Sequence, residues 1–214
     1  LTDIPGIAGH LLAASVMSAP AALVIAKIIY PETESSETMG DLKIHVEQNS
    51  SNAMEALGNG ATDGLKLAAN VGAMLVAFIS IVALVNYLLS FAGTSMDAIL
   101  AIVFKPLAWT MGVPWEEAGQ MGMLMGKKIV FTELIAYGDL KDIIAEGQIS
   151  ERTAIIASYA LCGFANFGSI GIQLGGIGGM APERKKDLAK LVTKAMVGGA
   201  LASWLTATVA GILI

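Results

Sequence analysis

The stretch that decides the fold is GFANFGSIGIQLGG, residues 163–176, which lies inside a segment without any charged residue, 153–182. Its five glycines each disfavour a helix interior by about 1 kcal/mol relative to alanine. Two polar residues, Asn166 and Ser169, follow the first of these glycines. We therefore expect a helix that enters the apolar segment and is interrupted across 164–169.

An interrupted backbone inside a membrane is stable only where it is buried in protein or lines a cavity. Secondary transporters use such half-helix ends to form binding sites near the bilayer midplane. The alternative is a glycine-rich face for close helix packing. That alternative explains the glycines but assigns no role to Asn166 and Ser169.

The composition indicates an all-α integral membrane protein. Hydrophobic residues make up 55% of the 214 residues, charged residues only 14%, and the mean hydropathy is +0.67, whereas a soluble domain has about 25% charged residues. A net charge of −5 gives no support for nucleic-acid binding by a basic surface. No nucleophile–base pair, phosphate loop or metal cluster is evident, His10 and His45 have no neighbouring ligands, and one cysteine cannot form a disulfide framework. We therefore expect neither an enzyme nor a cofactor.

The apolar runs predict the order of segments along the chain. Two pieces within 115–140 are too short to be separate crossings, for which about 20 residues are needed, so a re-entrant hairpin is preferred. Because the chain starts at Leu1 and enters an apolar run soon afterwards, we expect it to begin partway into a longer polypeptide. The expected segments are a transmembrane helix (11–29), an interfacial helix (53–66), a scaffold transmembrane helix (67–91), an interfacial helix (98–111), a re-entrant hairpin (115–140), a broken transmembrane helix (153–181) and a last transmembrane helix (183–214).

The basic residues predict the orientation. Lys27 closes the first apolar run, and Arg184, Lys185 and Lys186 precede the last one. The positive-inside rule puts both sites on the cytoplasmic side. Between these two basic sites the chain is expected to cross the membrane twice, once by 67–91 and once by the broken helix, while the hairpin enters and leaves on the same face. Two crossings return the chain to the cytoplasmic side, in agreement with the positive-inside rule. The last helix then crosses once more, so the C-terminus is expected outside.

Glu133 is the main candidate for chemistry, since it lies in the apolar context IVFTELIAY, residues 129–137. An ionisable residue within a membrane is costly, and such a residue is by default a candidate functional site. The alternative is an ion pair with Lys127 or Lys128, although spacings of six and five residues place these poorly on one helix face.

Several stretches together resemble the concentrative nucleoside transporters. The resemblance is collinear, extends over essentially the whole chain and corresponds to the C-terminal half of that family. Thr132 stands where the family more often has Asn. The matching stretches are HLLAASVMSAPAAL (10–23), YPETE (30–34), GVPWEEA (112–118), TELIAY (132–137), ALCGFANFGSIGIQLGG (160–176) and MAPERKKDLAKL (180–191).

This resemblance implies half of an inverted-repeat transporter in the plasma membrane, which is the inner membrane of a bacterium. It implies a sodium- or proton-coupled symporter that imports purine or pyrimidine nucleosides by an elevator-like, alternating-access mechanism, usually as a homotrimer. Residues that bind the coupling ion would lie mainly in the other half. By position, Glu133, Asn166 and Ser169 would hold the ribose, and Phe164 and Leu67 would contact the nucleobase. The first alternative is a non-transporting membrane scaffold or receptor subunit that uses Glu133 to pair with a partner's cation, and a channel is a less favoured third possibility.

Overall fold

The computed structural model describes residue 4 and residues 6–33 and 50–214, and within them every regular element is a helix. His45 and most of the polar connection after residue 33 lie outside the described residues. The helices are α1 (Ile7–Ile29), α2 (Ala53–Ser90), α3 (Met96–Thr110), α4 (Ala118–Val130), α5 (Glu133–Ala145), α6 (Glu151–Leu161), α7 (Phe167–Met180), a 3-10 turn (Pro182–Arg184) and α8 (Lys185–Leu213). The all-α expectation is confirmed for these residues.

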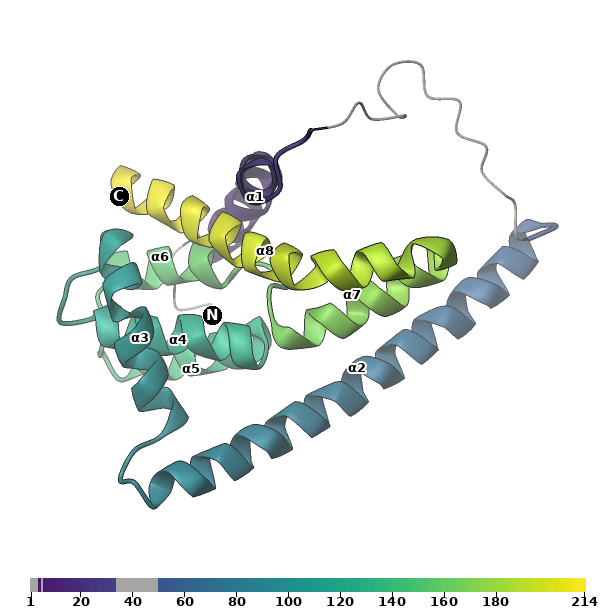
Figure 1. The fold of residues 1–214 in the computed structure, drawn as a ribbon. Helices are drawn as coiled ribbons and strands as arrows, with labels where there is room; N and C mark the ends of the chain where they lie inside the picture. Colours follow the sequence, from purple (N-terminus) through teal and green to yellow (C-terminus); the bar gives the residue numbers. More distant parts are fainter. Residues whose placement is uncertain (1–3, 5, 34–49) are drawn as a thin grey trace.

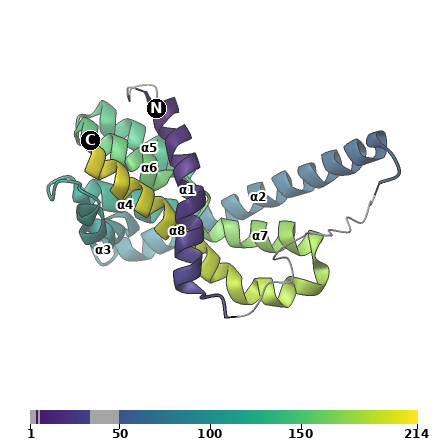
Figure 2. The same ribbon diagram turned by 90° about the horizontal axis from the view of Figure 1, so that it is seen from above.

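The helices form one packed body with a single long helix beside it (Figure 1). Helices α3, α4, α5 and α6 gather at one end, and α8 runs from that end along α7 (Figure 1). Helix α1 crosses α8, as the second view shows (Figure 2). Helix α2 runs apart from most of the body and packs against α7 and α3.

Helix α2 differs from the expected pair of segments. The sequence suggests an interfacial helix over 53–66 and a separate crossing over 67–91, but a single helix of 38 residues covers both. Asn52 caps its start by accepting a hydrogen bond from Glu55 N at 2.9 Å, and no proline interrupts it. At 1.5 Å per residue this helix is about 57 Å long, more than a bilayer core requires.

Helices α4 and α5 form the expected hairpin, with its tip at Phe131 and Thr132. The second arm extends to Ala145, beyond the expected end at residue 140. Lys127 joins the arms by an ion pair with Asp139 at 2.7 Å and reaches α3 by a pair with Asp97 at 2.9 Å. The hairpin is therefore held along its length as well as at its tip.

The start of the hairpin is tied to the start of α6. The Glu117 carboxylate, just before α4, accepts hydrogen bonds from Ser150 N at 3.1 Å and Ser150 Oγ at 2.9 Å. Burial acts to raise the pKa of Glu117, but hydrogen bonds from Thr153 and Ser150 hold it below its ordinary value. Because Ser150 also caps α6, this contact aligns the hairpin with the broken helix.

The broken helix is confirmed, but its break is shorter and earlier than expected. Helix α6 ends at Leu161, and α7 begins at Phe167. Gly163 has φ of +115°, a left-handed conformation that glycine adopts without the steric cost other residues meet. The later glycines, from Gly168 onward, lie inside α7, because the helix is restarted by the cap that Asn166 provides.

Two of the described helices are long and apolar enough to cross a membrane, Ile7–Ile29 and Lys185–Leu213, with mean hydropathies of 2.0 and 1.6. Half of the apolar window of α8 is buried inside the molecule, compared with 11% for α1. Helix α8 is therefore the central helix, which α1, α6 and α7 contact.

The contact between α3 and α4 depends on a glycine, and this gives a first prediction. A Cβ at Gly122 would lie 2.8 Å from Ala101 O and 2.9 Å from Lys105 N, whereas a Cβ at Gly119, one turn earlier, meets nothing within 4 Å. Gly122→Ala should destabilise the protein by roughly 1–3 kcal/mol, because backbone atoms of α3 would have to move. Thermal unfolding in detergent would measure this effect.

Gly119→Ala is the matched control for the same helix, and it should be neutral or slightly stabilising because alanine favours helix. Equal melting temperatures for the two variants would contradict the close packing of α3 on α4.

Candidate functional site

The restart of the broken helix fixes the first part of the site. Asn166 Oδ1 accepts a hydrogen bond from Ser169 N at 2.8 Å, and Asn166 N donates to Ser169 Oγ at 3.3 Å. This reciprocal arrangement is a capping box, which satisfies free N–H groups at a helix start. Both residues are buried, with 2% and 3% of their surface exposed. Because Oδ1 serves the cap, the amide nitrogen of Asn166 points away from the helix.

The hairpin tip places a carboxylate against that amide nitrogen. Asn166 Nδ2 donates a hydrogen bond to Glu133 Oε2 at 3.3 Å. Glu133 is the first residue of α5, where the N–H groups of the helix favour a negative charge. The residue is only partly buried. The structure therefore brings together Glu133, Asn166 and Ser169 from segments 33 or more residues apart.

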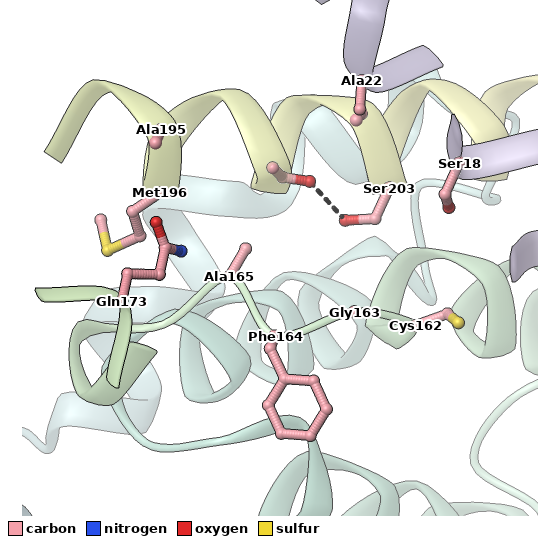
Figure 3. A pocket seen from close by; sticks show the side chains of 12 residues that line it. Ser18, Ala22, Cys162, Gly163, Phe164, Ala165, Gln173, Ala195, Met196 and Ser203 are labelled. Carbon is pink, nitrogen blue, oxygen red and sulfur yellow. Dashed lines mark hydrogen bonds between the residues drawn. The ribbon is translucent and has the colours of Figure 1, made fainter. Parts of the chain in front are cut away.

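The other two predicted residues, Phe164 and Leu67, lie on different elements. Phe164 is within the break, two residues before Asn166, and the residue is 72% exposed. Figure 3 shows Phe164 pointing away from α8, while the neighbouring Ala165 points toward it. Leu67 lies on α2, which packs against α7 and α3, and is 42% exposed. Leu67 is thus on a separate element from the Glu133 group.

The structure pairs neither candidate lysine with Glu133. Lys127 binds two aspartates, as described above. Lys128 is completely buried and donates hydrogen bonds to Ala160 O at 2.8 Å and Ser203 Oγ at 2.6 Å. Sequence reasoning considered Lys128 only as an ion-pair partner of Glu133. A lysine in an apolar helix, as in GKKIVFTEL (126–134), is the signal that could have marked it.

A cavity of about 210 Å³ lies on the side of the break that faces α1 and α8 (Figure 3). Its walls include Cys162, Gly163 and Ala165 from the break, Ser18 from α1 and Ser203 from α8. The dashed line in Figure 3 marks the hydrogen bond that the Ser203 hydroxyl donates to a backbone carbonyl of α8. The break is therefore bordered by this cavity as well as by the Glu133 carboxylate.

Within the described ranges, no group of three His, Cys, Asp or Glu side chains is placed to hold a metal ion. His10 instead lies beside Tyr159, with Nδ1 3.3 Å from the Tyr159 hydroxyl.

Comparisons with known proteins place this arrangement in context. A family model described as the Na⁺ dependent nucleoside transporter C-terminus matches residues 10–211. An uncharacterised transporter of Bacillus subtilis, YutK, is 46% identical over 213 residues, covering 96% of this chain and 52% of YutK. The nucleoside permease NupC of Helicobacter pylori is 41% identical over 215 residues, covering 96% of this chain and 51% of the permease.

The fold is also that of a solved transporter. A structure of CNTnw in an inward-facing, substrate-bound state aligns with a TM-score of 0.80 at 42% identity, covering 95% of this chain and 50% of CNTnw. The chain thus spans about half the length of the relatives it matches.

The capping box gives a second prediction. Asn166→Ala removes the acceptor for Ser169 N and should cost about 0.5–2 kcal/mol of local stability, as for other helix caps. Amide hydrogen exchange at the start of α7 should become faster. Asn166→Asp is the matched variant, because its carboxylate still accepts from Ser169 N while it cannot donate to Glu133. Unchanged exchange in Asn166→Ala would show that the cap does not stabilise the restart.

Proposed function

Because this chain belongs to the Na⁺ dependent nucleoside transporter family, we propose that it supplies the C-terminal part of a cation-coupled symporter that imports nucleosides. The observation that carries this proposal is the hydrogen bond between Glu133 of the hairpin and Asn166 of the broken helix. This bond links the tip of the α4–α5 hairpin to the break between α6 and α7. Polar groups brought together where helices are interrupted are typical of binding sites in secondary transporters. The relative NupC is named a nucleoside permease.

The chemistry of the polar group suits the ribose of a nucleoside. A carboxylate can only accept hydrogen bonds and has about four acceptor positions. Asn166 uses one position of Glu133, so two hydroxyl groups on neighbouring ribose carbons can donate to the others. The second N–H of the Asn166 amide can donate to a ribose oxygen, and Ser169 holds that amide in place.

The exposed ring of Phe164 supports contact with the nucleobase. It is 72% exposed and leaves the break in the direction opposite to α8. Aromatic rings stack on nucleobases of any type, so this contact fits either a purine or a pyrimidine. Leu67 is proposed as a second, apolar contact to the nucleobase. It is contributed by α2, which lies beside the packed body.

The packing of α1 against α8 supports the proposed orientation in the plasma membrane. Lys194 of α8 lies over the ring of Tyr30 at 5.3 Å, directly after α1 ends. The end of α1 that carries Lys27 therefore lies against the first third of α8, the part that follows the basic residues 184–186. The positive-inside rule then puts this end in the cytoplasm and the C-terminus outside.

The transport cycle is proposed to be elevator-like, driven by Na⁺ or H⁺. Helix α2 lies apart from most of the body (Figure 1), which suits a fixed scaffold along which the hairpin and the broken helix move. The family model's description as Na⁺ dependent favours Na⁺.

Helix α2 is also the proposed contact between copies in a homotrimer. It exposes large apolar side chains, including Val76, Leu84 and Leu88 at 68%, 58% and 57%. An apolar surface of this kind suits either lipid or a second copy of the chain.

A third prediction concerns Glu133. In the intact protein, Glu133→Gln should weaken uridine binding by about 10- to 100-fold, because hydrogen bonds to a charged group contribute roughly 1.5–3 kcal/mol. Uptake into proteoliposomes and competition with 2′,3′-dideoxyuridine would measure the loss and its dependence on the diol. Asp142→Asn, an exposed change on the same helix, is the control and should retain wild-type uptake.

Wild-type uptake by Glu133→Gln would contradict the assignment of the site. Failure of the wild-type protein to bind any nucleoside would favour the scaffold or receptor-subunit alternative.

A fourth prediction concerns the oligomer. Native mass measurement in a mild detergent should give three copies, and the double substitution Leu84→Lys and Leu88→Lys on α2 should give single copies, because buried unpaired charges are costly. Leu12→Lys on α1, also an exposed leucine, is the control. A single copy for the wild-type protein would contradict the trimer.

A further inference from the structure

Among the side chains that the structure describes, Lys128 is the one fully buried cation, and it lies near the end of the first hairpin arm. None of its surface is exposed, and within the described part of the chain no carboxylate lies within ion-pair distance. Its neighbour Lys127 is different, because that side chain is 16% exposed and binds Asp97 and Asp139. The charge of Lys128 therefore has a role that an ordinary salt bridge does not explain.

The ammonium group of Lys128 points at the end of α6, where the broken helix stops. The last four carbonyl groups of any helix lack partners within the helix, and the helix end carries partial negative charge. Ala160 O, one residue before the end of α6, accepts from Lys128 Nζ at 2.8 Å. Ser158 O, two residues earlier, accepts from the Tyr137 hydroxyl at 2.7 Å. Each arm of the hairpin thus caps one free carbonyl of α6.

These two contacts lie on either side of the hairpin tip. Lys128 is five residues before Glu133 and Tyr137 is four residues after it. The carbonyls that they bind lie six and eight residues before Asn166. Glu133 is therefore flanked in the sequence by two residues that hold the hairpin to the end of α6, and these contacts fix its position relative to Asn166.

Free cations are commonly bound by half-helix ends and unwound carbonyls in transporters. Here a covalently attached ammonium occupies that position. Its second partner, Ser203 Oγ, shares its one hydrogen between Ala200 O at 2.9 Å and Gly199 O at 3.3 Å, so the hydroxyl accepts from Lys128. The group is thereby anchored on α4, α6 and α8 together.

We propose that Lys128 acts as a built-in cation at the open end of α6, in place of a bound metal ion, and that it is the positioning residue for the Glu133–Asn166 pair. This inference rests on the proposed nucleoside transport. If the Lys128 ammonium occupies the end of α6, the coupling ion binds elsewhere in the protein. The Lys128 ammonium binds Ser203, which lines the cavity beside the break together with Cys162. If the lysine side chain were absent, a small cation from that cavity could reach the free carbonyls of α6.

The test uses the intact protein in proteoliposomes with three substitutions. Lys128→Met removes the charge at similar length, Lys128→Ala leaves space for an external cation, and Lys128→Arg retains the charge. Lys127→Met is the matched control on the neighbouring residue. The readouts are the KM and maximal rate of uridine uptake, and amide exchange over residues 160–169, which needs no nucleoside.

Lys128→Met and Lys128→Ala should raise the KM about tenfold or more, with a smaller change in maximal rate and with faster exchange over 160–169. Millimolar n-propylammonium should restore both readouts in Lys128→Ala, whereas the bulkier tetramethylammonium, which has no N–H donor, should not. Lys128→Arg should lie closer to the wild type than Lys128→Met. Lys127→Met should lower the melting temperature and leave the KM close to that of the wild type.

Wild-type KM and exchange in Lys128→Ala would overturn the inference, as would a loss that n-propylammonium does not reverse. If neither neutral variant folds, n-propylammonium present during purification should recover folded Lys128→Ala, and failure of that recovery counts equally against the inference. If the wild-type protein takes up no nucleoside, the proposed function fails, and the exchange readout alone then decides the role of Lys128.

Discussion

The structure depends on the need to satisfy the backbone groups that are freed where α6 stops and α7 begins. A helix broken inside a membrane leaves free carbonyls on one side of the break and free N–H groups on the other, and no water is present to bind them. On the α7 side, the capping box of Asn166 and Ser169 satisfies the N–H groups. On the α6 side, the N–H of Cys162 satisfies Tyr159 O, and the hairpin supplies Lys128 and Tyr137 as donors to Ala160 O and Ser158 O. The docked hairpin therefore stabilises the break by satisfying two carbonyls that α6 leaves free.

This requirement links the scaffolding contacts to the polar site. Helix α3 supports the first arm of the hairpin by close backbone approach at Gly122, and Lys127 holds the arms together and to α3. These contacts stabilise the hairpin itself, whereas Lys128 and Tyr137 hold it to the end of α6 and so place Glu133 against Asn166. Pre-arranged hydrogen-bonding groups lose little freedom when a ligand binds, which strengthens binding. A nucleoside that meets this group would find its acceptors already oriented.

The contact between the hairpin and the broken helix is made by residues of this chain alone. The chain spans about half the length of YutK, NupC and CNTnw, and yet the Glu133–Asn166 contact forms within it. In the proposed function, the charge at the hairpin–helix contact is supplied by the protein itself. The energetic coupling of an external cation to the substrate would then arise outside the contacts of this chain.

The sequence by itself determined the fold class, the hairpin and the existence of a break, because an uncharged segment with clustered glycines and a carboxylate in an apolar run are local signals. The family resemblance pointed to Glu133, Asn166 and Ser169 together. The sequence did not determine where the break begins, because glycines after Asn166 remain helical once that residue caps α7. It also did not predict that α2 is continuous, since a change from polar to apolar composition does not end a helix. Only the tertiary structure decided the partners of Lys128, because they lie on α6 and α8, 32 and 75 residues away, and no local pattern records which free carbonyl a distant side chain will reach.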